Sequence, residues 1–199
     1  VIGERENGLL KIRIKTWDNK TDYYLDFKSG FDFENETYSA SIGSNPDFNT
    51  DLLRYSYTSL TTPYSVIDHN IKSQEEEIKK QQEILGGEFD SNNYTSERLF
   101  ATAHDGKKIP ISIVRHVDTE LSPETPILQY AYGSYGSTVD PSFSSVRLSL
   151  LDRGFAFAIA HIRGGQYLGR PWYEDGRMLS KKNTFKDFVS CSKYLIDNN

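Results

Sequence analysis

The stretch FAFAIA at residues 155–160 decides the fold of the second half of this chain. It is an unbroken run in which apolar residues do not alternate with polar ones, which is typical of a strand buried on both faces. The segment ILQYAY at 127–132 predicts a second strand, and helices are predicted at 144–151, after Pro171 and from Thr184 onward. Strands that alternate with helices favour a parallel α/β sheet. In the last helix, Thr184 is the expected N-cap, and one apolar stripe is expected to contain Phe185, Phe188, Val189, Ser192, Leu195 and Ile196.

The first half of the chain carries a different pattern. Residues 9–15 alternate apolar and charged side chains at period two, and short strands are predicted at 23–27, 37–42, 53–58 and 64–68. Such strands suggest a sandwich, a barrel or a propeller blade. We therefore predict an all-β module at 1–75, a connection at 76–94 and an α/β module at 95–199. The Glu75–Glu77 run is expected to be solvated, and Asp105-Gly106 predicts a hairpin.

Composition excludes several classes of protein. The 199 residues include 23 Lys and Arg against 28 Asp and Glu, a formal net charge of −5, which argues against a nucleic-acid binder. No apolar run approaches the roughly 18 residues that a membrane helix needs. The one Cys excludes an internal disulfide, and the four His are too far apart for a metal site, so no metal is expected. No signal peptide is visible at Val1, and both ends are expected to be cuts through a longer protein, so the N-terminus does not indicate the location. The cytoplasm is the expected location.

A loop rich in Gly and Tyr follows the predicted strand 127–132, which is expected to be buried. Its sequence is YGSYG at 132–136, and in open α/β sheets ligands bind at the carboxyl ends of the strands. Its glycines permit a close approach of the backbone to a ligand, and the phenols of Tyr132 and Tyr135 can donate hydrogen bonds. The alternative is an aromatic-packed turn. Ser134 is not expected to be a nucleophile, because the chain contains no G-x-S-x-G elbow.

Three other polar positions have competing explanations. Asp140, which precedes Pro141, fits the N-cap of a helix, or it faces the cleft and receives a cationic group. His161 is expected to be a hydrogen-bonded core histidine, and Cys191 a small buried hydrophobe of the last helix. The Gly164-Gly165 pair does not make a phosphate-binding loop, because no Lys-Ser/Thr follows it.

Taken in order, several segments resemble motifs of the prolyl oligopeptidase family of serine peptidases, and most closely its oligopeptidase B branch. The matching segments are AYGSYG at 131–136, DPSFSSVRLSLLDRG at 140–154, AHIRGG at 160–165, LGRPWYEDG at 168–176, KKNTF at 181–185, LRYSYTSLTTP at 53–63 and QQEILGG at 81–87. The resemblance implies the last part of a seven-bladed β-propeller in 1–75. It also implies that 95–199 form the first part of an α/β-hydrolase catalytic domain, ending before the nucleophile elbow.

The same resemblance implies roles for individual residues. Tyr132 would donate a hydrogen bond to the oxyanion, Tyr135 would line the substrate cleft, and Asp140 would bind basic residues of the substrate. The expected substrates are short peptides cleaved after Lys or Arg. The catalytic Ser, Asp and His would lie outside this chain, so these residues alone are expected to be inactive. No cofactor is implied.

Two departures from the family pattern stand beside these expectations. Ser142 occupies a position where some relatives have a second acid, and Gln166-Tyr167 replaces the usual small residue and Glu. Two alternatives stay open at this point. The first is another enzyme of the same family with prolyl or acylaminoacyl specificity, and the second is a catalytically dead binding module.

Overall fold

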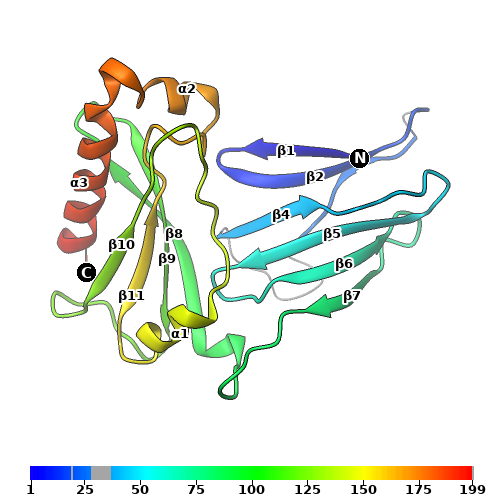
Figure 1. The fold of residues 1–199 in the computed structure, drawn as a ribbon, viewed down its shortest axis with the longest axis horizontal. Helices are drawn as coiled ribbons and strands as arrows, with labels where there is room; N and C mark the ends of the chain where they lie inside the picture. Colours follow the sequence, from blue (N-terminus) through cyan, green and yellow to red (C-terminus); the bar gives the residue numbers. More distant parts are fainter. Residues whose placement is uncertain (19, 28–36, 199) are drawn as a thin grey trace.

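The all-β part of the molecule contains two antiparallel sheets. The computed structural model describes residues 1–18, 20–27 and 37–198. One sheet has the order β1 (Ile2–Glu6), β2 (Leu9–Lys15), β3 (Asp22–Tyr24), and the other the order β4 (Tyr38–Ile42), β5 (Leu52–Ser59), β6 (Ser65–Asn70), β7 (Glu76–Gln81) (Figure 1). Both sheets contribute to one apolar core: Ile12, Ile14, Leu25, Phe27, Ala40, Leu53, Tyr55, Tyr57 and Ile67.

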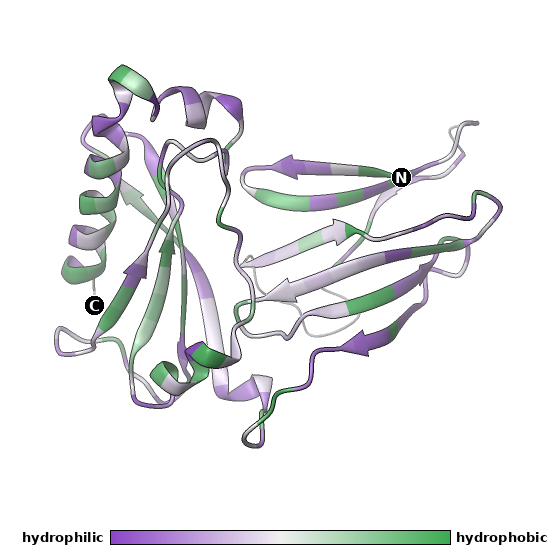
Figure 2. Cartoon of the chain, viewed as in Figure 1, coloured by the Kyte–Doolittle hydropathy of each residue, from purple (hydrophilic) through white to green (hydrophobic). Residues whose placement is uncertain are grey.

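The strands predicted around 9–15, 37–42, 53–58 and 64–68 are confirmed, whereas β1 and β7 were not predicted. Strand β7 corrects the predicted connection at 76–94, because residues 76–81 pair with β6 and belong to the sheet. Its sequence, EEIKKQ, is mostly exposed and largely hydrophilic (Figure 2). Charges on an edge strand discourage pairing with another chain. Since backbone hydrogen bonds rather than an apolar face hold β7 in place, hydrophobic periodicity did not reveal it.

The second half forms a sheet with the order β10-β11-β9-β8. Its strands are β8 (Tyr94–Thr102), β9 (Lys108–His116), β10 (Ile127–Tyr130) and β11 (Ala156–Ala160). The hairpin at Asp105-Gly106 makes β8 and β9 antiparallel, and β11 also runs antiparallel to β9. The expected parallel arrangement occurs between β10 and β11, because the chain returns to the sheet through α1 (Ser145–Leu151). The sheet is therefore mixed, and β11 is its buried strand as predicted.

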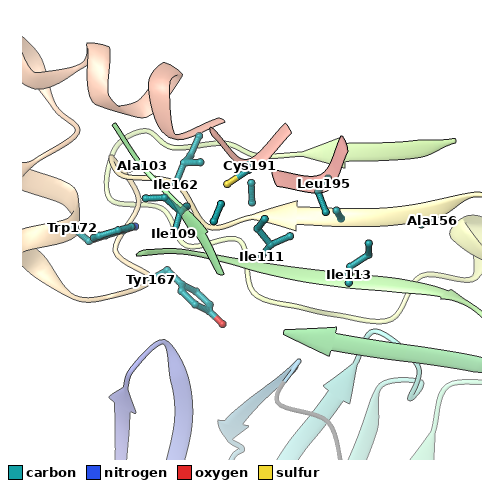
Figure 3. Packing of buried hydrophobic residues seen from close by; sticks show 13 residues of the cluster. Ala103, Ile109, Ile111, Ile113, Ala156, Ile162, Tyr167, Trp172, Cys191 and Leu195 are labelled. Atoms are coloured by element: carbon teal, nitrogen blue, oxygen red, sulfur yellow. The ribbon is translucent and has the colours of Figure 1, made fainter. Parts of the chain in front are cut away.

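The C-terminal helix α3 (Lys182–Asp197) packs on this sheet, together with the shorter α2 (Arg170–Glu174) (Figure 3). The predicted apolar stripe of α3 is wrong in part: Phe185 is 65% and Ile196 73% exposed. Leu195 is buried as predicted and Phe188 packs against the core, and the other buried residues of the helix are Thr184, Asp187 and Cys191. Two of the four buried residues are polar, so a pattern of apolar residues predicted the buried face only in part. Cys191 lies in the core as predicted, and burial raises the pKa of its thiol to about 12.

The all-β and α/β parts pack directly against each other. Leu60, which follows β5, is buried in a cluster with Val114, Leu151 and Ile159 of the α/β part. The backbone N–H of Phe143 donates to Thr58 Oγ1 at 3.1 Å, which adds a polar contact between the two parts. No helix in the described ranges has both the length and the apolar character that crossing a membrane demands.

The β1–β2 hairpin reaches the α/β part at its turn. Gly8 there has φ +88°, and a Cβ at this position would lie 2.2 Å from Cε1 of Tyr167. The guanidinium of Arg98, on β8, donates to the backbone carbonyl of Asn7. Figure 3 shows the Tyr167 side chain pointing from the α/β core toward this hairpin. Glycine is therefore required at position 8 both by the backbone angle and by the aromatic ring beside it.

Candidate active site

The tyrosine loop, residues 132–136, lies where β10 ends and close to the segment that follows β11. Because β10 and β11 are parallel, their carboxyl ends meet at the same edge of the sheet. Tyr132 is 48% exposed and its phenol makes no hydrogen bond within the described part of the chain. Tyr135 is 87% exposed and has φ +56°. Two phenols are therefore presented to solvent at the edge where ligands bind.

The strand that precedes this loop differs from the prediction. We expected a buried strand, but β10 alternates half-buried and exposed residues, and Leu128 is 48% exposed. Among the described residues β10 pairs with β11 alone, so its other side is not covered by a neighbouring strand.

Glycines hold the tyrosine loop tightly against its neighbours. A Cβ at Gly133 would lie 2.6 Å from Thr184 and 2.8 Å from Ile162. A Cβ at Gly164 would lie 2.2 Å from the carbonyl oxygen of Gly133, and the N–H of Gly136 donates to the Gly164 carbonyl at 3.0 Å. These two loops can approach so closely only because side chains are absent. The backbone on either side of Tyr132 and Tyr135 is consequently well defined.

Lys181 also contacts this loop, and the sequence did not indicate it. Its Nζ donates to the carbonyl oxygen of Gly133 and, at 2.7 Å, to Ser134 Oγ. Partial burial lowers the pKa of the Lys181 ammonium group from its ordinary value. The only sequence signal was its position two residues before Asn183 in the KKNTF segment.

Asp140 lies in the interface between the two parts of the molecule. Helix α1 begins at Ser145 and is capped at Ser144, so the N-cap explanation of Asp140 is wrong. Its carboxylate instead accepts two hydrogen bonds from the Arg5 guanidinium of β1, at 2.7 and 2.8 Å. The side chains of this pair are 22% and 23% exposed. Asp140 therefore binds a guanidinium in this structure, and it is one from the chain itself.

His161 is the hydrogen-bonded core histidine that the sequence predicted. It is 4% exposed, and its Nε2 lies 2.8 Å from the hydroxyl of the fully buried Ser112. The Tyr167 ring stacks on the imidazole at a centroid distance of 3.7 Å. Burial, with the nearby cations Arg98 and Arg5, lowers the pKa of His161 to about 3. Because Ser112 and His161 are shielded from solvent, this Ser-His pair cannot attack a peptide.

The stacked Tyr167 explains one departure from the family pattern. Its ring is 2% exposed, and the guanidinium carbons of Arg5 and Arg98 lie 5.6 and 5.8 Å from its centroid. Burial raises the pKa of its phenol, so Tyr167 stays neutral. An aromatic ring thus stands between His161 and two cations, where the usual glutamate would bring a negative charge.

A buried ion network supports the loop after β11. Arg163, 1% exposed, donates to Asp187 of α3 through Nε at 2.8 Å and Nη2 at 2.6 Å, and to Asp105 of the hairpin through Nη1 at 2.6 Å. Arg163 lowers the pKa of Asp105 by its hydrogen bond and its charge. The expected N-cap role of Thr184 is wrong, because the cap of α3 is Lys181. Thr184 is buried and donates to the carbonyls of Arg163 and Gly176.

The described residues do not bring together the side chains that a metal ion needs. In the ranges that the structure describes, no three His, Cys, Asp or Glu residues gather closely enough to hold a metal ion. The site consists of the tyrosine loop with the exposed phenol of Tyr132, the carboxylate of Asp140 that binds a guanidinium, and the buried side chains that support them, which we call the buried frame. This set can donate a hydrogen bond to a polarised oxygen and can bind a cationic group.

Both parts of the chain match families of known proteins. Residues 1–82 match the N-terminal β-propeller domain of prolyl oligopeptidases, and residues 141–199 match the prolyl oligopeptidase family. Dipeptidyl aminopeptidase BI of Pseudoxanthomonas mexicana is 45% identical over 98% of this chain, which covers 26% of that protein. Protease 2 of Moraxella lacunata is 35% identical over the whole chain, which covers 28% of it.

Solved structures agree with these matches. Oligopeptidase B from Trypanosoma brucei, in a closed form with covalently bound antipain, is 37% identical with a TM-score of 0.84, and the match covers 98% of this chain and 28% of that one. Oligopeptidase B from Leishmania major is 36% identical with a TM-score of 0.83 over the same shares. The chain spans about a quarter of the length of the curated relatives it matches. These matches confirm the predicted fold class of propeller strands followed by part of an α/β-hydrolase sheet.

Proposed function

The chain belongs to the prolyl oligopeptidase family, and we propose that it supplies the oxyanion side of the active site in a serine peptidase of short peptides. In this proposal residues 1–75 and strand β7 are propeller, and residues 95–199 begin the catalytic domain. The catalytic Ser, Asp and His are contributed by sequence outside these residues. We also propose that the 199 residues alone do not hydrolyse peptides, since the Ser112–His161 pair is buried.

The observation that carries this proposal is the free phenol of Tyr132 on a clamped loop at the ligand-binding edge of the sheet. When a serine attacks a peptide carbonyl, negative charge develops on the carbonyl oxygen. A neutral O–H donor held in place at that oxygen stabilises the transition state more than the ground state. Tyr135, exposed on the same loop, lines the cleft and contacts the substrate.

A second observation favours basic substrates. Asp140 holds the guanidinium of Arg5 in a two-bond arrangement, which is the geometry that a substrate arginine needs. We propose that a basic residue of the substrate, next to the Lys or Arg after which the peptide is cleaved, takes the place of Arg5 on Asp140. This favours basic peptides over the substrates of the prolyl and acylaminoacyl alternatives, because neither a proline nor an acylated terminus needs a carboxylate there. A catalytically dead binding module stays as the alternative that the following experiment rejects.

Tyr132→Phe in the peptidase that contains this chain tests the proposal. We expect kcat on an arginyl amide substrate to fall about 100-fold to 1,000-fold while KM changes little, because the phenol acts mainly in the transition state. Tyr130→Phe is the matched control, since it removes a phenol from β10 two residues earlier. An unchanged kcat for Tyr132→Phe would leave Tyr132 as a surface tyrosine and overturn the proposal.

A further inference from the structure

We infer that Lys181 is a positioning residue, whose ammonium group holds the tyrosine loop and thereby fixes the phenol of Tyr132. This inference rests on the function proposed above, because it assigns Lys181 an effect on catalysis through Tyr132. In this inference Lys181 itself does not contact the reacting atoms.

The ammonium group of Lys181 contacts the tyrosine loop and one ring. Its Nζ donates to the carbonyl oxygen of Gly133 and to Ser134 Oγ, at 2.7 Å for the latter, and lies 5.9 Å from the centroid of Phe185. Gly133 and Ser134 are the two residues directly after Tyr132. A movement of either residue is therefore passed to Tyr132 through one or two peptide units.

The position of Lys181 has no explanation in the stability of its own helix. It is the N-cap of α3, and it makes no side-chain capping bond. A cation at a helix N-terminus faces the positive end of the helix dipole, which is unfavourable. Within the described ranges no carboxylate forms an ion pair with Lys181, and its partial burial lowers the pKa of its ammonium group. What offsets these costs is the pair of hydrogen bonds to the loop.

The loop needs such a contact on this side. Gly133, Tyr135 and Gly136 all have positive φ, at +64°, +56° and +67°. A left-handed conformation at a tyrosine is strained and persists only where the surroundings impose it. Ile162 and Thr184 restrain the α-carbon of Gly133, and Lys181 restrains its carbonyl oxygen. Without Lys181 the peptide between Gly133 and Ser134 loses its charged donor.

Loss of that donor should affect the rate more than binding. A displacement of about 1 Å in a catalytic group can cost roughly 100-fold in rate. We expect Lys181→Met, which keeps the length of the side chain and removes all its donors, to lower kcat on an arginyl amide about 10-fold to 100-fold with little change in KM. Lys182→Met, at the exposed next residue, is the matched control and should leave kcat unchanged.

A double variant separates positioning from general stability. If Lys181 acts through Tyr132, the variant Tyr132→Phe with Lys181→Met should have the same kcat as Tyr132→Phe alone. Independent, multiplying losses, or a lower melting temperature with an unchanged kcat, would overturn the inference. Should Lys181→Met fail to fold, Ser134→Ala removes one of the two acceptors and should lower kcat several-fold, and no loss would overturn the inference. An unchanged kcat in Tyr132→Phe instead refutes the proposed function itself.

Discussion

Replacing Arg5 by glutamine removes the cation that occupies Asp140 and leaves the carboxylate free for a substrate. In the structure the two side chains share two hydrogen bonds of 2.7 and 2.8 Å and are each less than a quarter exposed. A basic substrate residue that binds Asp140 must therefore break this pair first. Arg5→Gln should increase the affinity for substrates with an arginine next to the residue after which they are cleaved.

The size of the effect follows from the environment of the pair. Fully exposed ion pairs are worth about 0.2–1 kcal/mol, whereas breaking a buried pair costs about 3–5 kcal/mol. The net free energy of exchanging Arg5 for a substrate arginine is near the value for exposed pairs, because the new ion pair replaces the one that is lost. If the pair with Arg5 competes with the substrate and is worth about 1 kcal/mol, it weakens the affinity for the substrate roughly five-fold. We expect KM to fall about five-fold for the arginine-containing peptide, and less at high salt, because salt screens partly exposed charges.

The assay compares KM for two peptides that are both cleaved after the same arginine and differ only at the residue before it, arginine or alanine. The alanine peptide should be unaffected by Arg5→Gln. Asp140→Asn should raise KM several-fold for the arginine peptide alone. Arg98→Gln is the matched control, because Arg98 anchors the same hairpin through the carbonyl of Asn7.

Equal changes in KM for both peptides would mean that Arg5 acts on the packing of the hairpin rather than on the subsite. The same conclusion would follow if Arg98→Gln reproduced the effect of Arg5→Gln. No change in KM in Arg5→Gln and Asp140→Asn would remove Asp140 from the substrate site altogether.

Two further predictions concern the buried frame. His161 has a pKa of about 3 when folded and an ordinary value of 6.5, so its contribution to stability is complete above pH 6.5 and declines by about 1.4 kcal/mol per unit as pH falls toward 3. His161→Gln should remove that slope from urea unfolding measured at pH 6.5, 5 and 4, whereas the exposed His104→Gln should keep it; equal slopes would contradict this. Asp187→Asn leaves Arg163 buried with one carboxylate fewer and should lower the free energy of unfolding by about 3 kcal/mol. The exposed Asp197→Asn on the same helix should change it by less than about 0.5 kcal/mol, and a similar small loss for Asp187→Asn would refute the role of the network.

Local sequence patterns were sufficient for the elements whose burial follows a simple period. The run at 155–160 is apolar on both of its faces, so the sequence alone predicted that β11 is a buried strand. Asp105-Gly106 specified a hairpin through the backbone freedom of its glycine, which has φ +82°. Strand β7 escaped because its pairing uses backbone groups, which every residue carries, and its charged side chains show no buried face.

In the candidate site, too, some features were predictable from local sequence and others were not. Local sequence features were enough to predict a loop with Tyr132 and Tyr135 after a strand, because a strand end and a Gly-rich turn are both local. The partners of these residues depend on long-range packing: Arg5 is 135 residues from Asp140, and Lys181 is 47 residues from Ser134. The period of a helix or strand records which face is buried. It does not record which charged side chain the folded backbone brings to another, since that depends on the packing of whole elements.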